Sequence, residues 1–104
     1  MAQFDVYTNP NPVTKRVIPY LLDIQADLLN NLATRVVIPL YTVSAMGKPA
    51  KHLNLQFSVK RTTVIMSTAE LAGVAVKSLG EKVCSLKDNR NEIIAAIDFL
   101  VTGF

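Results

Sequence analysis

The stretch Arg35-Val-Val-Ile-Pro-Leu-Tyr-Thr-Val43 is rich in β-branched and apolar residues. Such a run, too short for a typical helix, predicts a strand that is buried more deeply than its neighbours. Pro39 interrupts the run and lacks the N–H that a central strand normally donates. We therefore expect a buried strand that is interrupted at Pro39.

Shorter strands are predicted on both sides of this run. Gln3–Thr8 alternates apolar and polar residues, which is the period of a half-buried strand. Lys60-Arg61 lies between two further candidates as a two-residue hairpin link, but it is a poor sequence for a primed turn, so a wider loop is an open alternative. The other predicted strands are Val17–Ile24, with Pro19 at an edge or bulge, Leu53–Val59, Thr62–Ser67 and Val74–Val76. Loops or turns are predicted at 9–12, 26–31, 46–51, 69–73 and 79–80.

A helix is predicted from about Asp88 to Val101, with Ser85 or Asp88 capping its start. Its apolar residues follow the i, i+3, i+4, i+7 spacing of a single stripe. Many strands followed by one helix, with no alternation between the two, indicate an antiparallel sheet or small barrel with a helix packed across it.

Composition limits the class of protein. The chain has 104 residues, half of them hydrophobic, which suits one domain with its own core. No segment approaches the ~20 apolar residues of a membrane span, and the N-terminus does not resemble a signal peptide. The lone Cys84 cannot form an internal disulfide, so a reducing cytoplasm is expected. The net charge of +3 is scattered rather than clustered, which favours a solvated surface over a nucleic-acid site.

The sequence offers little catalytic chemistry. His52 stands alone in a predicted loop, and Cys84, beside Val83, is predicted to be a small buried hydrophobe. No phosphate-binding loop or hydrolase motif is present, so we predict no catalytic residue, no cofactor and no metal site. Asp23 and Asp27 form the one close carboxylate pair of interest, either as an acid/base pair or as turn caps and partners of Arg35. Function by binding is therefore favoured.

The C-terminal segment Asp98-Phe-Leu-Val-Thr-Gly-Phe104 is unusual because it ends on a large apolar side chain. Most domains end in polar, frayed residues. Such an end either completes the protein's own core or docks into a partner.

With these features in view, five blocks of the chain resemble the CcdB toxin family in order and spacing. The most specific are the strand Thr34-Arg-Val-Val-Ile-Pro-Leu40 and the helix Asn91–Phe104, which ends in glycine and one apolar residue. The supporting blocks are Gln3–Tyr7, Leu22–Leu29 and Leu71–Val76, the last followed by Leu79–Val83.

The resemblance implies a single toxin domain over residues 1–104, built as an SH3-like small barrel with an additional antiparallel sheet and a C-terminal helix. It implies a symmetric homodimer and a non-enzymatic toxin of a type II toxin–antitoxin pair. Such toxins bind the A subunit of DNA gyrase and trap the cleaved gyrase–DNA complex. A cognate CcdA-like antitoxin neutralises them, and operator DNA is bound only together with that antitoxin.

The resemblance also carries over a gyrase-binding set from the loop after the second strand and from the helix end. It comprises Leu28, Leu29, Asp98, Val101, Thr102, Gly103 and Phe104. The alternative is that both leucines and Phe104 complete the protein's own core. The best-known members end in Phe-Trp-Gly-Ile where this chain has Val-Thr-Gly-Phe. Because a tryptophan hot spot is worth ~2–4 kcal/mol, gyrase affinity is expected to be ~30- to 1,000-fold lower unless Phe104 compensates.

The antitoxin-binding surface implied by the resemblance lies in two loops, residues 9–15 and 41–51. Its candidate residues are Lys15, Tyr41, Lys48 and Lys51, and the positive charges of the three lysines suit an acidic antitoxin tail. Two other functions stay open at this point. One is an mRNA interferase, a ribonuclease toxin on the same fold, and the other is a regulatory homologue that does not poison gyrase.

Overall fold

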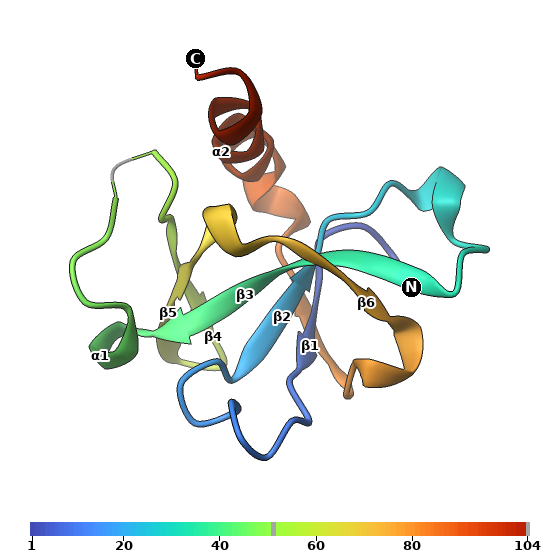
Figure 1. The fold of residues 1–104 in the computed structure, drawn as a ribbon, viewed down its shortest axis with the longest axis horizontal. Coiled ribbons are helices and arrows are strands. Elements are labelled where there is room, and N and C mark those ends of the chain that lie inside the picture. The colour runs from blue at the N-terminus through green and yellow to red at the C-terminus, as the bar shows by residue number, and fades with distance from the viewer. Residues whose placement is uncertain (51, 104) are drawn as a thin grey trace.

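The computed structural model describes residues 1–50 and 52–103, and within them a curled antiparallel sheet with a C-terminal helix (Figure 1). The strands are β1 (Asp5–Thr8), β2 (Tyr20–Asp23), β3 (Thr34–Thr42), β4 (Gln56–Val59), β5 (Thr62–Met66), β6 (Ala72–Ala75) and β7 (Lys82–Ser85). The α-helices are α1 (Val43–Met46) and α2 (Arg90–Thr102), and the short 3₁₀ turns are η1 (Asp27–Leu29), η2 (Thr68–Glu70), η3 (Val76–Ser78) and η4 (Lys87–Asn89). The strand order is β4-β5-β3-β2-β1-β7, and β6 branches from β3.

Strand β3 is the central strand of the sheet and pairs with three others. It pairs with β2 along one side, and on the other side with β6 through its first half and β5 through its last residues. Pro39 lies where β3 changes from one of these partners to the other. Its carbonyl accepts the Ser67 N–H at 3.1 Å, and the N and O of one strand residue point to the same side. The missing N–H therefore faces the junction, where no ladder bond is lost.

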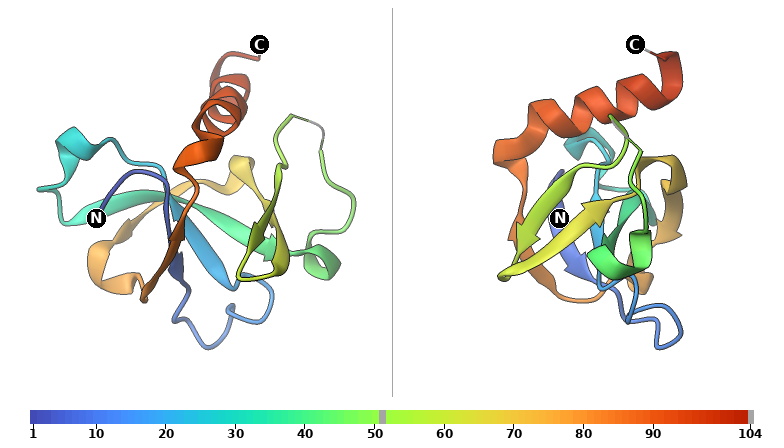
Figure 2. Two further views of the ribbon diagram at one scale, coloured as in Figure 1. Left: turned by 180° about the vertical axis from the view of Figure 1, so that it is seen from behind. Right: turned by 90° about the vertical axis from the view of Figure 1, so that its left-hand side faces the viewer.

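The concave side of the sheet holds the core. Residues that alternate along the strands point inward and are fully buried, among them Val6, Leu22, Ile38, Leu40, Val59, Val64 and Met66. Helix α2 lies across one end of the curled sheet (Figure 2) and contributes Ile93 and Ala96 to the same cluster. The expected mainly-β fold, an SH3-like half-barrel with a C-terminal helix, is confirmed. Among the described residues all seven strands belong to one sheet, with β6 branching from β3, so the additional antiparallel sheet is not a separate one.

Helix α2 starts two residues later than predicted. The turn η4 occupies residues 87–89, and Asn89 is the N-cap residue without a side-chain cap bond. The prediction that Ser85 or Asp88 caps the helix is wrong, since the Ser85 hydroxyl accepts the N–H of Lys87 instead. The predicted apolar stripe is confirmed in its first part, where Ile93 and Ala96 are buried and Ile94 and Ile97 are half-buried, but its later member Val101 is exposed.

The sequence missed two short elements. Strand β7 pairs with β1, and α1 follows β3 directly. Cys84 in β7 is half-buried against the core as a small hydrophobe, and burial raises the pKa of its thiol.

The link between β4 and β5 is a two-residue turn, because Val59 pairs with Thr62, so the wider loop is wrong. Lys60 and Arg61 have φ angles of +47° and +66°, which non-glycine residues rarely adopt.

Candidate protein-interaction surfaces

The loop between β2 and β3 presents leucines to solvent. Leu28 is 96% exposed, Leu29 is 48% exposed and Leu32 is 49% exposed. No residue of η1 is buried, so the alternative that Leu28 and Leu29 complete the protein's own core is wrong. Three exposed leucines within five residues form an apolar surface, which we call the leucine loop surface.

A buried ion pair lies directly beneath this loop. Arg35 of β3 is 1% exposed and Asp23 of β2 is fully buried. The Nη2 and Nε atoms of Arg35 both donate to Asp23 Oδ2, at 2.6 and 2.9 Å. The prediction that Asp23 pairs with Arg35 is confirmed. Because a carboxylate this deeply buried needs a charged partner, the pair fixes the end of β2 against β3.

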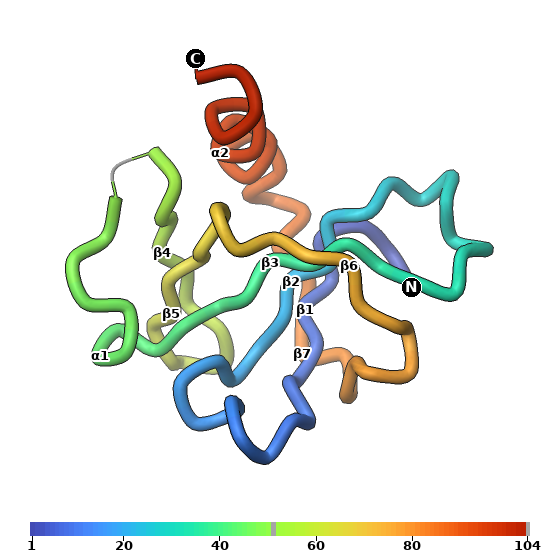
Figure 3. The backbone as a smooth tube through the Cα atoms, in the orientation of Figure 1, coloured from blue at the N-terminus to red at the C-terminus, as the bar shows by residue number. Residues whose placement is uncertain are grey.

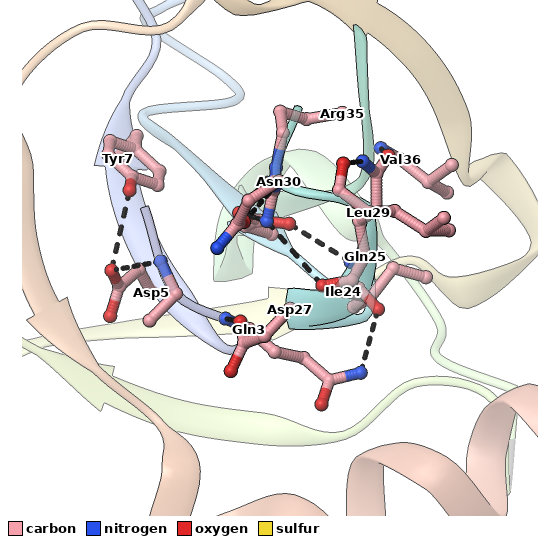
Figure 4. A network of polar contacts seen from close by, with 12 residues as sticks. Gln3, Asp5, Tyr7, Ile24, Gln25, Asp27, Leu29, Asn30, Arg35 and Val36 are labelled. Atoms are coloured by element: carbon pink, nitrogen blue, oxygen red, sulfur yellow. Dashed lines mark hydrogen bonds and ion pairs between the residues drawn. The ribbon is translucent and has the colours of Figure 1, made fainter. Parts of the chain in front are cut away.

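Two polar side chains connect this ion pair and its strands to the loop (Figure 4). Asn30 accepts a hydrogen bond at its Oδ1 from Arg35 Nη1, at 2.6 Å. Gln25 donates from Nε2 to the carbonyl of Leu29 at 2.9 Å and accepts the Val36 N–H at its Oε1, at 3.1 Å. We call Asp23, Gln25, Asn30 and Arg35 the anchoring cluster. It ties the loop to both strands.

The C-terminal end of α2 is a second exposed apolar region. Val101 is 75% exposed, and Asp98 and Thr102 are exposed beside it. The Thr102 hydroxyl donates to the Asp98 carbonyl at 2.7 Å. Gly103 ends the helix with a φ of +77° and donates its N–H to the Phe99 carbonyl at 2.9 Å. Phe104 lies outside the described residues. This left-handed glycine cap closes the helix end through its own backbone.

The two regions lie apart on the molecule. Figure 3 shows the loop that carries η1 on one flank of the sheet and the end of α2 above its centre. The structure brings Leu28 and Leu29 together with Leu32, and Asp98 together with Val101–Gly103, as two separate patches. Leu32 was missed, although an apolar residue in the same polar loop was the signal for it. Gln25 and Asn30 carry no such signal, because their role depends on the fold.

The two loops predicted for antitoxin binding meet at the other end of β3. The Thr42 N–H donates to the Val17 carbonyl at 2.9 Å, which joins residues 9–19 to the start of α1. Lys15 and Lys48 are exposed. The Tyr41 hydroxyl donates to Glu70 Oε2 at 2.8 Å, and partial burial, reinforced by Glu70, raises the tyrosine's pKa. Lys51 lies outside the described residues.

The two carboxylates of the candidate acid/base pair, Asp23 and Asp27, have different partners and do not face a common site. Asp23 is engaged with Arg35, whereas Asp27 is exposed and accepts the Gln3 N–H at 2.7 Å. His52 is exposed as predicted, and its ring centroid lies 5.1 Å from that of Phe99. Across residues 1–50 and 52–103, no three His, Cys, Asp or Glu side chains form a possible metal site. Within the same residues, no helix has the length and apolarity to cross a bilayer.

A curled antiparallel sheet with a long C-terminal helix across one end places the chain among small, mainly-β proteins. Its fold is similar to that of two solved structures from mycobacterial species, each 14% identical in sequence with a TM-score of 0.75. One is an endoribonuclease in complex with its cognate antitoxin, matched over 97% of this chain and 94% of that one. The other is an endoribonuclease, matched over 97% and 90%.

The sequence itself matches the model of one protein family. The profile described as "CcdB protein" matches residues 3–103. The chain therefore belongs to the CcdB family, which supports a toxin of a toxin–antitoxin pair.

Proposed function

We propose that this toxin is a non-enzymatic poison of DNA gyrase. It binds the A subunit as a symmetric homodimer and traps the cleaved gyrase–DNA complex. The observation that carries the proposal is the exposure of apolar side chains at both predicted contact regions, Leu28 at 96% and Val101 at 75%, in a member of the CcdB family. Exposed apolar patches on small proteins mark binding surfaces, and a twofold dimer suits a twofold target.

The helix end sets the expected strength of this interaction. Thr102 stands where the best-known members of the family carry tryptophan, and its hydroxyl is already bonded to the Asp98 carbonyl. It offers little apolar area, so Val101 and the leucine loop surface must supply more of the binding energy. We expect an affinity lower by ~30- to 1,000-fold than a tryptophan contact would give, unless Phe104 compensates.

A gyrase cleavage assay tests the proposal. The protein is incubated with gyrase, ATP and supercoiled plasmid, and linear DNA is scored after detergent and protease treatment. Linear DNA is expected from the intact chain and is expected to be lost on deleting residues 102–104 and in Leu28→Asp. The matched control is Val13→Asp, which places the same charge at another exposed apolar residue, 84% exposed, away from both patches. No linear DNA from the intact chain would refute the proposal.

A cognate antitoxin is the second proposed partner, and operator DNA is bound only by the toxin–antitoxin complex. Lys15 and Lys48 are exposed on loops joined through Val17, which suits an acidic antitoxin segment. The double variant K15E/K48E is expected to lose antitoxin affinity at low salt. Lys77→Glu, an exposed lysine in η3, is the control. Unchanged affinity of the double variant would contradict this assignment.

A ribonuclease function is the second candidate, because both structural neighbours are endoribonucleases with a TM-score of 0.75. It needs accessible acid and base groups. Asp23 is fully buried in its ion pair with Arg35. Of the two candidate acid/base carboxylates, Asp23 and Asp27, only Asp27 is therefore accessible. RNA cleavage by the purified protein that disappears in Asp27→Asn would replace the gyrase proposal.

A further inference from the structure

The leucine loop surface is tied to itself and to the sheet by hydrogen bonds within this chain alone. Within the loop, the N–H of Leu29 donates to the Ala26 carbonyl at 2.9 Å, and the N–H of Leu32 donates to the Leu29 carbonyl at 3.2 Å. These are two successive tight turns. The Leu29 carbonyl that joins them also accepts the Gln25 side chain at 2.9 Å. One oxygen thus links the loop's own turns to the anchoring cluster.

The Gln25 side chain links the loop to the sheet through two hydrogen bonds. Its side chain is 7% exposed, and each end of its amide is engaged, with the Val36 N–H on one side and the Leu29 carbonyl on the other. Asn30 is exposed, but its amide oxygen accepts from the buried Arg35 guanidinium at 2.6 Å. A hydrogen bond to a charged donor is about twice as strong as a neutral one. Both residues therefore hold loop to sheet.

We propose that Gln25 and Asn30 are positioning residues that preform the leucine loop surface for a protein partner, and that Leu32 is a third contact residue on it. The inference rests on the proposed function, in which that partner is the gyrase A subunit. Side chains and loops that are ordered before binding avoid the entropic cost of ordering on binding. An exposed leucine on a mobile loop would lose part of its binding energy to that cost.

Leu32 extends the surface beyond the two residues expected from sequence. Its exposed fraction of 49% equals that of Leu29 within one per cent, and its N–H bonds the Leu29 carbonyl. Leu29 and Leu32 therefore begin and end one hydrogen-bonded turn. Partial exposure of this kind lets an apolar side chain gain area from a partner while it stays fixed by its own fold.

Two variants separate positioning from folding. Asn30→Ala removes the oxygen that Arg35 Nη1 donates to but leaves the Asp23–Arg35 pair in place. Gln25→Glu keeps the acceptor for Val36 and removes the donor to Leu29. Affinity for the gyrase A subunit is expected to fall ~3- to 10-fold in each, with faster amide exchange in residues 28–32 and an unchanged exchange rate in β3. Asn30→Asp, which keeps an oxygen for Arg35, is expected to restore affinity.

Leu32→Ala is expected to weaken gyrase binding as much as Leu29→Ala, with no change in loop exchange. Faster loop exchange with unchanged affinity in Asn30→Ala and Gln25→Glu would overturn the positioning role. An unchanged affinity in Leu32→Ala would remove that residue from the surface. If Leu28→Asp has lost affinity for the gyrase A subunit, the gyrase proposal stands under either of these two outcomes. If the intact protein poisons gyrase but Leu28→Asp binds it normally, the leucine loop surface is not the gyrase site and the positioning proposal falls, whereas the gyrase proposal falls only if the intact chain yields no linear DNA.

Discussion

The leucine loop surface and the end of α2 both expose large apolar side chains, but they are held in opposite ways. Beneath the loop lies a buried charged pair with two amide struts. The end of α2 extends past the core, with its last buried residue at Ala96, and is closed by backbone bonds and a left-handed glycine. The conformation of the loop therefore depends on side chains of the sheet beneath it. The conformation of the helix end depends mainly on hydrogen bonds within the helix.

This difference predicts which substitutions change the stability of the whole protein and which act only locally. A change in the Asp23–Arg35 pair acts on global stability, because it leaves a charge unpaired in the interior. A change at residues 98–103 acts locally, since that segment can fray without opening the core. Four predictions test this contrast.

The largest effect is expected from breaking the buried pair. Arg35→Ala leaves Asp23 buried without its partner, and the free energy of unfolding is expected to fall by about 3–5 kcal/mol. Urea denaturation followed by far-UV circular dichroism measures it. Replacing both partners, as R35M/D23L, is expected to cost less than the single change, because no orphan charge is left. A loss below ~1 kcal/mol in Arg35→Ala would show that the pair does not hold the loop region.

Alkaline pH should weaken the same region through Tyr7. Burial, followed by the charge of Asp5, raises the pKa of Tyr7 to about 12 from 10.0. The unfolded chain loses this proton first, so the stabilising contribution is complete below pH 10 and is lost as pH rises through about 12.

The shift corresponds to an upper limit of about 2–3 kcal/mol. Urea midpoints measured between pH 9 and 12 should fall more steeply for the natural protein than for Tyr7→Phe. Parallel slopes for the two proteins would contradict this assignment of Tyr7.

A background more stable by about 1 kcal/mol would sharpen both tests. The double variant K60N/R61G supplies residues that accept positive φ in the β4–β5 turn, relieving strain that costs ~1–2 kcal/mol per residue, less the added entropy of glycine. It should raise the urea midpoint without altering gyrase cleavage. Arg61→Lys, which keeps the strain, is the control. A lowered urea midpoint would show that the positive φ angles of Lys60 and Arg61 do not destabilise the protein.

The smallest effect is expected at the helix end. In Gly103→Ala the new methyl group meets nothing within 4 Å, so the cost is the left-handed backbone alone. Because the last turn can fray, global stability should change by less than ~0.5 kcal/mol. Amide exchange at residues 101–103 should accelerate while residues 28–32 stay protected. A global loss above ~1 kcal/mol would show that the helix end is coupled to the core.

The sequence predicted the regular elements to different degrees. The buried strand around Ile38, the β4–β5 hairpin and the apolar stripe of α2 followed from local periodicity, which needs no knowledge of the rest of the chain. Strand β7 did not, because its pairing joins residues far apart in the sequence, such as Cys84 and Val6. Helix α1 did not, because its four residues are too few to show a helical period and its first residue, Val43, continues the β-branched run of β3. The helix start was also misplaced, because η4 takes its first turn.

The candidate site shows the same division. Leu28, Leu29 and the helix end came from a family resemblance, and the structure adds that the leucines are exposed. Leu32 and the roles of Gln25 and Asn30 were not predicted. Their hydrogen bonds join residues brought together by the β2–β3 register, such as Gln25 with Val36.

The sequence by itself determined the class of fold and the family, because residue alternation, helical spacing and the order of the blocks that resemble the family can be read along the chain. Only the tertiary structure decided that Arg35 is buried and Leu28 is exposed, against the usual preference of both residue types. The physical reason is that burial depends on which side chains the folded strands place around a residue. Asp23, twelve positions away from Arg35, supplies the charge that makes the buried guanidinium possible.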